Sequence, residues 1–417
     1  MKMQQFMENK DYWFALKSSV YVEFKTEQML LYDTNSGNRI ETGDKDAISF
    51  VSQLYEPKNL GVTLLSKELI WNPAISGFVH EVLEKRMGDL TDVEKSPNKP
   101  VRLIPILNLQ KDVDKLMKNE ENYPLIGKDA KNYLLELNIY LNSRCSLNCR
   151  HCDRYYKQIH CCTTHHANQE LTFEEIESIF RQIRFSSVGR INLLGGNIFE
   201  YSYMQQAYRL FDSFKDSLHG CFHYANYRPN VLPESLKSEI MVTFPVCEDI
   251  FNNTWRLVDR EKTTFHLIIE NDEQYSQMEN LIHTYNIENY VILPVYTGDN
   301  AGFFEDNVYV DRDNLFVHTL SMREIFRNQK LNANFFGSLH ILPDGAVKAC
   351  INTPATGNIR TDSLMDLIFR EMVENTAWRI VRDSKPCNDC IYQFICPPPS
   401  NYETVIGKPN LCNKCYA

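Results

Sequence analysis

The sequence has no long apolar run, little glycine and no excess of positive charge. Its longest apolar pieces, such as Val291 to Val295, fall far short of the roughly 18 residues that a spanning helix needs. The stretch from Met1 to Lys10 has no hydrophobic signal-peptide core. Forty-four basic residues stand against 54 acidic ones, a net charge of −10, which argues against a general nucleic-acid or anionic-membrane footprint. We therefore expect a cytoplasmic protein with no membrane span and no nucleic-acid partner.

What the chain does have is length and cysteine. Its 417 residues suggest two or three domains, and 43% hydrophobic with 24% charged residues is typical of a chain that folds throughout. Thirteen cysteines without a secretion signal indicate metal ligands or reactive thiols in place of a disulfide framework. Most of them form two clusters. These are Cys145, Cys149, Cys152, Cys161 and Cys162, then Cys387, Cys390, Cys396, Cys412 and Cys415, with Cys221, Cys247 and Cys350 apart.

Residues 1–100 are predicted to form a small α+β module. Three short strands followed by two helices outline a winged-helix-like unit. A polar, proline-containing stretch closes it, and 101–131 is assigned to a linker. The strands are predicted at 20–24, 29–33 and 39–42, and the helices after Asp44 and after Asn72.

Between 132 and 330, strands alternate with amphipathic helices, which predicts a parallel sheet with crossover helices and about six βα units. Ligands bind at the carboxyl ends of such strands, so loops that follow a strand are the places to search. The loop after the first strand carries the first cysteine cluster. Strands are predicted at 134–141, 191–194, 221–225, 240–244, 264–270 and 290–296, and helices at 172–185, 204–216, 249–260 and 273–285.

Residues 331–417 break this alternation. A hairpin is predicted from strands at 338–342 and 346–350, joined by the turn Pro343-Asp344-Gly345. A helix is expected over 362–382. The cysteine-rich tail beyond it has no amphipathic pattern, so it needs metal to hold it together.

The first cluster has the spacing C-x3-C-x2-C directly after a strand. Three thiolates on one tight loop can hold three irons of a [4Fe–4S] cluster and leave the fourth iron open. A closed cluster or a structural zinc site needs four protein ligands, so the triad either borrows a distant fourth or is open by design. Zinc or scattered buried cysteines are the competing interpretations.

A strand followed by C-x3-C-x-aromatic-C in a partial barrel resembles the radical S-adenosylmethionine (SAM) enzymes. The resemblance implies that Cys145, Cys149 and Cys152 bind the cluster, that SAM chelates the open iron, and that His151 lies beside the adenine. It also implies that an electron entering the sulfonium yields a 5′-deoxyadenosyl radical, which abstracts hydrogen from a substrate.

Gly195 and Gly196 end the second strand, where missing side chains let a ligand approach the backbone. In radical SAM proteins this position resembles the GGEP motif, which takes the SAM amino group. Here Asn197 replaces its glutamate and Ile198 its proline. A turn after a strand also uses two glycines, so a SAM role rests on the resemblance.

In the second cluster, Cys387, Cys390, Cys396 and Cys412 supply four thiolates, enough for a closed auxiliary [4Fe–4S] cluster, with a zinc ribbon as the alternative. With the preceding hairpin and Gly357-Asn358, the pattern resembles a SPASM domain, the auxiliary-cluster extension of peptide-modifying radical SAM enzymes. Thr361 and Asp362 stand where that domain has a further cysteine, so one auxiliary cluster is expected, and Cys350 and Cys415 stay uncommitted.

The remaining cysteines have less distinctive surroundings. Cys161 and Cys162, with His160 and His165-His166, are candidates for metal binding or substrate contact, although vicinal cysteines are poorly placed to chelate one ion together. Cys221 and Cys247 lie in apolar strand contexts, where a buried small hydrophobe is the default. Cys161 or Cys162 is a guess for a hydrogen donor, and no catalytic residue is designated.

The element order of the N-terminal module resembles the PqqD-like element that binds leader peptides. An exposed strand there would capture an extended peptide by strand addition. The whole chain then resembles a SPASM-type maturase of ribosomally made peptides, of the grasp-associated and Gly-Gly-leader families. The implied fold is α/β: a partial (β/α)6 barrel with an N-terminal winged-helix-like α+β module and a C-terminal SPASM/twitch-like extension.

Two interpretations of function remain. In the first, the protein cleaves SAM and modifies a precursor peptide, with a flavodoxin or ferredoxin as reductant. In the second it is a pseudo-radical-SAM partner, which binds the precursor and assists a second maturation enzyme without catalysis. The bond formed in the substrate is not specified by either.

Overall fold

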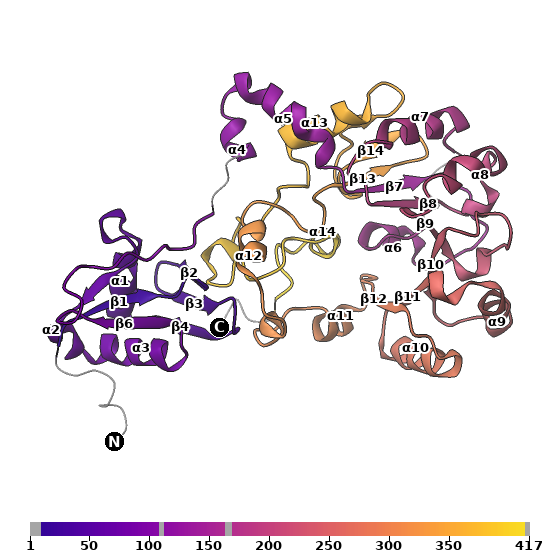
Figure 1. Ribbon diagram of the computed structural model, residues 1–417. Coiled ribbons are helices and arrows are strands. Elements are labelled where there is room, and N and C mark those ends of the chain that lie inside the picture. Colours follow the sequence, from indigo (N-terminus) through magenta and orange to yellow (C-terminus); the bar gives the residue numbers. More distant parts are fainter. Residues whose placement is uncertain (1–9, 108–111, 163–168, 413–417) are drawn as a thin grey trace.

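The computed structural model describes residues 10–107, 112–162 and 169–412. It consists of an N-terminal module, a large mostly parallel sheet, and a cysteine-rich segment between the two (Figure 1). The cysteine-rich segment comprises residues 322–328 and 375–412. The cysteine-rich segment packs against both other parts. Within the described ranges, no helix has both the length and the apolar character needed to cross a membrane.

Two small antiparallel sheets form the N-terminal module, in the orders β5-β1-β6 and β2-β3-β4. The second sheet consists of the three strands that the sequence predicts, at the predicted residues, whereas the first sheet escapes the sequence pattern. Helices α1 and α3 begin where expected, because Asp44 and Asn72 cap them through their side chains. The elements are β1 (Tyr12–Leu16), β2 (Val20–Phe24), β3 (Met29–Asp33), β4 (Arg39–Thr42), α1 (Lys45–Ser52), β5 (Thr63–Leu65), α2 (Lys67–Ile70), α3 (Pro73–Glu84) and β6 (Gly88–Asp92).

Strand β3 is buried on both faces. Met29 and Leu31 pack in the module's own core, while Leu30 and Tyr32 point the other way and pack against Ile325, Ile391 and Ile395 of the cysteine-rich segment. The Tyr32 hydroxyl also accepts a hydrogen bond from the backbone N–H of Leu320, at 2.8 Å. The second packing partner therefore explains the apolar run from Met29 to Tyr32 in β3. The contact between β3 and this partner fixes the module against the rest of the protein.

Part of the expected 101–131 linker is helical. Helices α4 (Val113–Leu116) and α5 (Tyr123–Asp129) lie there, and Ile126 and Ala130 are buried in the main core. Because its apolar side chains are buried in the main core, the segment packs against the domain that contains the large sheet.

The large sheet has nine strands in the order β12-β11-β10-β9-β8-β7-β13-β14-β15. Strands β7 to β12 are parallel and follow one another in chain order, which is the arrangement that successive βα units produce. Four of the six strands lie close to their predicted positions, whereas β9 and β10 each begin three residues earlier than predicted and end at His223 and Thr243. Their bounds are β7 (Glu136–Tyr140), β8 (Arg190–Leu194), β9 (Leu218–His223), β10 (Lys237–Thr243), β11 (Thr263–Ile269) and β12 (Tyr290–Pro294).

Helices cover the two faces of this sheet unequally. Alternate strand residues such as Ile139 and Leu193 pack with the crossover helices, whereas the intervening residues such as Tyr140 and Leu194 pack with α6 and the residues after it. Figure 1 shows α6 against β8, β9 and β10. We call the α6-covered side the inner face. The helices are α6 (Cys152–Gln158), α7 (Phe173–Ile183), α8 (Met204–Asp212), α9 (Glu248–Leu257), α10 (Asp272–Tyr285) and α11 (Ala301–Asn307).

The C-terminal hairpin belongs to the same sheet. Strand β13 (Ser338–Ile341) pairs in parallel with β7 and antiparallel with β14 (Ala346–Lys348), which in turn pairs with β15 (Gly357–Asn358). The predicted 362–382 helix is shorter, because α13 (Leu364–Glu374) ends at Asn375 in the left-handed conformation, φ 54°. Helices α12 (Met322–Asn328) and α14 (Asn401–Ile406) complete the segment.

Candidate functional site: two groups of thiols

The first cysteine motif lies at the carboxyl end of β7. Cys145 and Cys149 are on the loop that follows this strand, Cys152 begins α6, and all three are half-buried. Burial, then the thiol of Cys162, then those of Cys152 and Cys145 raise the pKa of the Cys149 thiol to about 12. The side-chain N–H group of Asn226 approaches the sulfur of Cys145 at 3.8 Å. The three cysteines thus lie on one loop and the helix that follows it, with a hydrogen-bond donor beside Cys145, and three thiolates are the ligand type that iron–sulfur clusters use.

The two glycines after β8 pack tightly against this loop. A Cβ on Gly195, whose φ is +147°, would lie 2.7 Å from the carbonyl oxygen of Asn142, and one on Gly196 would lie 2.1 Å from that of Arg144. The Gly196 N–H donates to the Asn142 carbonyl at 2.9 Å. Close contact with the cysteine loop thus accounts for both glycines. A SAM-binding role for them stays a prediction.

Asn197, at the position of the GGEP glutamate, is turned inward. Its side-chain oxygen accepts the N–H of Phe199 at 3.1 Å, and it is 2% exposed. It caps the short helix Ile198–Glu200. Its side chain therefore serves the local backbone.

A pocket of about 300 Å³ opens beside the cysteine loop, at the carboxyl ends of β11 and β12. Its lining includes Arg150 and His151 of the motif, with Glu270 and Asp299 opposite. The His151 ring nitrogen Nε2 lies 3.8 Å from a carboxylate oxygen of Glu270, and that carboxylate also accepts the hydroxyl of Tyr155. The pocket thus combines two carboxylates with two basic groups next to the three thiols.

The second group of thiols surrounds a cavity of about 190 Å³. All four predicted ligands line it. They reach it from different segments: Cys387, Cys390 and Cys396 follow α13, and Cys412 is held by a bridge to Val310. Burial and then the neighbouring thiols of Cys390, Cys412 and Cys387 raise the pKa of the Cys396 thiol to about 12, although Arg382 opposes this rise.

Arg382 lies in this cavity wall. Its guanidinium donates to Glu403 at 2.6 Å and approaches the Cys387 sulfur at 3.9 Å. The arginine and glutamate side chains are only 10% and 7% exposed. The guanidinium thus lies beside the Cys387 sulfur and opposes the rise in the pKa of the Cys396 thiol.

The four thiols lining the cavity are a donor set that suits either a closed [4Fe–4S] cluster or a tetrahedral zinc ion. Among the described residues, no three His, Cys, Asp or Glu side chains are already positioned to hold a metal ion.

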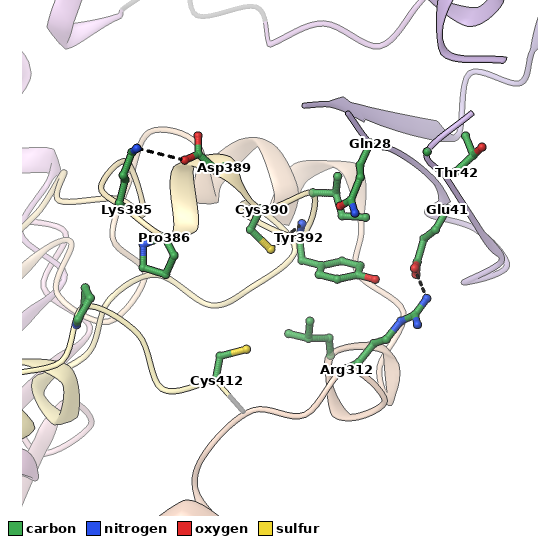
Figure 2. Close-up of a pocket in the computed structure, with 14 residues that line it drawn as sticks. Gln28, Glu41, Thr42, Arg312, Lys385, Pro386, Asp389, Cys390, Tyr392 and Cys412 are labelled. Atoms are coloured by element: carbon green, nitrogen blue, oxygen red, sulfur yellow. Dashed lines mark hydrogen bonds and ion pairs between the residues drawn. The ribbon is translucent and has the colours of Figure 1, made fainter. Parts of the chain in front are cut away.

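A groove of about 920 Å³ lies between the N-terminal module and this second group of thiols (Figure 2). Glu41 and Thr42 of strand β4 form one wall, and Tyr392 lies across from them. Cys390 and Cys412 line both the groove and the four-thiol cavity. Strand β4 is at the edge of its sheet. The groove thus runs from a sheet edge to the thiols.

Comparison with protein families identifies part of this region. Residues 333–391 match the SPASM family, an iron-sulfur cluster-binding domain. The match includes Cys350, Cys387 and Cys390, and it confirms the SPASM resemblance for this segment. Cys396 and Cys412 lie beyond the matched residues. We call residues 333–412, which are the matched segment and the residues that follow it, the SPASM region.

Solved structures show weaker similarity. SuiB of Streptococcus suis bound to the precursor peptide SuiA is 12% identical, with 97% of this chain and 100% of that chain covered and a TM-score of 0.47. BtrN in complex with AdoMet and 2-DOIA is 14% identical, with 59% and 88% covered and a TM-score of 0.28. No curated protein sequence matches this chain significantly. Since these TM-scores are below 0.5, functional inference rests on the chain's own residues.

The uncommitted cysteines take other positions. Cys350 in the SPASM region is buried, its thiol donates to Asn401 Oδ1 at 3.0 Å, and it is not among the residues that line the cavity. Cys221 is buried on β9 as expected, but Cys247 is exposed, because it precedes α9 at the surface. Cys415 and His165-His166 lie outside the described residues.

Sequence reasoning missed the polar side chains of the inner face. Glu239 of β10 is 5% exposed and accepts hydrogen bonds from His219 at 2.7 Å, His266 at 2.6 Å and Arg190 at 2.7 Å. Burial alone would raise the pKa of Glu239, but these partners hold it well below its usual range. The alternation of charged residues with apolar ones in the strands is the signal that predicts them.

Proposed function

We propose that the protein is a radical SAM maturase of a ribosomally made peptide. The observation that carries the proposal is the pairing of two unlike thiol sites. One is a three-cysteine loop at the carboxyl edge of a parallel sheet, next to a pocket, and the other is a four-cysteine cavity in a SPASM region. Three thiolates leave one iron for an exogenous ligand, and four close the second cluster.

In this proposal Cys145, Cys149 and Cys152 hold the first cluster, which when bound would deliver the electron that cleaves SAM. The pocket beside the motif would receive SAM. Carboxylates such as Glu270 and Asp299 are suited to accept hydrogen bonds from ribose hydroxyls. His151 would face the nucleoside, with its orientation set by Glu270.

Cys387, Cys390, Cys396 and Cys412 would hold one auxiliary cluster. Arg382 would balance part of its negative charge, and its ion pair with Glu403 keeps the guanidinium beside the thiols. Cys350 is engaged with Asn401, and Asp362, at the place of a further SPASM cysteine, pairs with Arg370 at 2.8 Å. Both contacts favour a single auxiliary cluster.

The precursor peptide would lie in the groove. The outward edge of β4 offers backbone groups for strand addition, as the PqqD-like resemblance implies. Because Cys390 and Cys412 line the same groove, a peptide held by β4 would pass beside the auxiliary cluster. An external flavodoxin or ferredoxin would supply electrons.

One observation favours the non-catalytic alternative. Asn197 is buried and its side-chain oxygen accepts the Phe199 N–H, so this position offers SAM no carboxylate in place of the GGEP glutamate. In this alternative the protein binds the precursor and assists a second maturation enzyme.

Release of 5′-deoxyadenosine separates the two. Anaerobically reconstituted protein is reduced in the presence of SAM, and the nucleoside is measured by mass spectrometry. The maturase proposal predicts release that disappears in the Cys145→Ala/Cys149→Ala/Cys152→Ala variant. Equal background levels in both proteins, with iron bound at the triad, would favour the partner role.

A further inference from the structure

Strand β12 is an uncovered edge of the large sheet. It pairs with β11 on one side, and in the described part of the chain no strand pairs with its other side (Figure 1). The side chains of Tyr290, Val291 and Ile292 are 40%, 42% and 37% exposed. Soluble proteins usually protect such an edge with a charged residue or a proline. From Tyr290 to Leu293 the sequence has neither.

The helix that follows β12 explains this exposure. Paired residues of neighbouring strands point to the same face, so Tyr290 and Ile292 share a face with the two β11 residues opposite them. Those two residues, Phe265 and Leu267, are buried in the main core. Helix α11 has only seven residues and packs its Phe304 in a separate cluster. It therefore does not cover β12 as the longer crossover helices cover the other strands.

The backbone of β12 offers hydrogen-bonding groups on the free edge. The carbonyl of Asn289 and the N–H of Val295 both bond to β11, at 3.0 and 2.9 Å. Since successive backbone groups alternate in direction along a strand, those of Tyr290 and Ile292 point away from β11. The edge thus offers the N–H and the carbonyl of each of these two residues.

Pro294 limits this edge at its carboxyl end. It has no N–H to donate, and its carbonyl already accepts the Tyr402 hydroxyl at 2.8 Å. A strand added to β12 therefore pairs with Tyr290 and Ile292 and ends before Pro294.

We propose that β12 pairs with β12 of a second copy of this chain, antiparallel, about a twofold axis at Val291. In this register Tyr290 faces Ile292 of the second copy on both sides of the axis, so hydrogen bonds across the axis use all of the free backbone groups. The facing side chains are aromatic and β-branched, which is a favourable cross-strand pair. The nearest charged residue, Glu288, faces Pro294 of the second copy, so no like charges meet.

The free groups of the chain itself select this register. A shift of the axis to Ile292 would place Tyr290 opposite Pro294, where the donor is missing and the carbonyl is taken. Because two five-residue strands bury little area, we expect a weak dimer that forms at micromolar or higher concentration.

The test measures the mass of the full-length, iron-loaded protein by anaerobic sedimentation velocity over a concentration series. Ile292→Pro removes the outward N–H and leaves the bonds to β11, since an edge tolerates proline. Ile292→Val keeps that N–H and is the matched control. Ile292→Lys adds a charge to the edge. Its control is Leu257→Lys, at an exposed apolar residue that ends α9.

The expected result is a mass that rises toward two chains with concentration in the wild type and both controls. Ile292→Pro and Ile292→Lys should raise the dissociation constant about tenfold or more, because hydrogen bonds or apolar contacts at the axis are lost. Their unfolding midpoints in dilute protein should equal that of the wild type, which shows that the sheet itself is intact. If the proline variant does not fold, Ile292→Lys decides the question.

Amide hydrogen exchange locates the contact. Exchange in residues 289–295 should slow as the concentration rises in the wild type and stay fast in Ile292→Lys. A wild type that remains monomeric at all concentrations would overturn the inference. So would a dimer that neither Ile292 variant weakens, because it would use another surface.

Discussion

The two thiol sites differ in how the chain brings their cysteines together. Cys145, Cys149 and Cys152 come from one loop and the start of α6, and all are half-buried. The SPASM-region thiols come from separated segments around one cavity, with Arg382 in its wall. A local motif can lose its metal while the fold stays, whereas a site that joins distant segments is part of the fold. The difference predicts that loss of the second site lowers the stability of the fold, whereas loss of the first site removes activity with little loss of stability.

The largest expected effect is on stability at the second site. Cys387→Ala should remove about half of the iron and lower the apparent unfolding midpoint by roughly 10 °C, because the cluster would tie residues 387–396 to Cys412. Iron and sulfide analysis with anaerobic thermal scans measures both. Cys247→Ala, an exposed cysteine outside both sites, is the control. A midpoint equal to that of the control would show that the site is not structural.

Loss of the first site should remove iron with little change in the unfolding midpoint. The triad triple-alanine variant should also lose about half of the iron, but its midpoint should shift by only about 1–3 °C, since its loop is anchored by backbone contacts with Gly196 and Asn197. The same thermal scan measures it. A midpoint as low as that of Cys387→Ala would remove the distinction between the two sites.

Arg382→Met should cost about 3–5 kcal/mol of unfolding free energy, because it leaves Glu403 charged and buried. Denaturant titration of the iron-loaded protein measures the loss. Arg382→Met/Glu403→Leu is the matched variant, and it should recover part of the stability. A double variant no more stable than the single one would mean that the arginine acts on the thiols alone.

A further effect on stability is expected at Glu239, on the inner face of the sheet. Glu239→Gln should cost about 2 kcal/mol at neutral pH through loss of charged hydrogen bonds. The folded-state pKa of Glu239 lies below its ordinary value of 4.5, so the carboxylate stabilises the fold above pH 4.5. The difference between wild type and variant should shrink as the pH falls below that value. A pH-independent difference in denaturant titrations would contradict the assignment.

Much of the fold is predictable from local pattern. Buried β-branched and apolar runs give the parallel strands, and Asp44 and Asn72 give helix starts by capping. The end of α13 is not predictable in this way, because Asn375 adopts a left-handed conformation that the apolar pattern does not signal. Strand β1 pairs with β5 and β6, which lie far from it in the sequence, so no hairpin turn signals this sheet.

The site is predictable to the level of its cysteines and no further. Spacing identifies both groups of thiols, and the four-thiol cavity contains all four predicted residues. The burial of Cys161 and Cys162 depends on how α6 crosses the inner face, and the groove depends on how β3 docks on Ile391. The apolar run of β3 signals that the strand is buried on both faces, but it does not identify the packing partner.

The central claim is that the triad holds a cluster open to SAM and the SPASM region a closed one. Electron paramagnetic resonance of the reduced protein, with and without SAM, tests it directly when wild type is compared with the triad triple-alanine variant and Cys387→Ala. The account predicts two signals, of which SAM shifts only the one that the triple variant lacks. A SAM-induced shift that survives in the triple variant, or none in wild type, would contradict it.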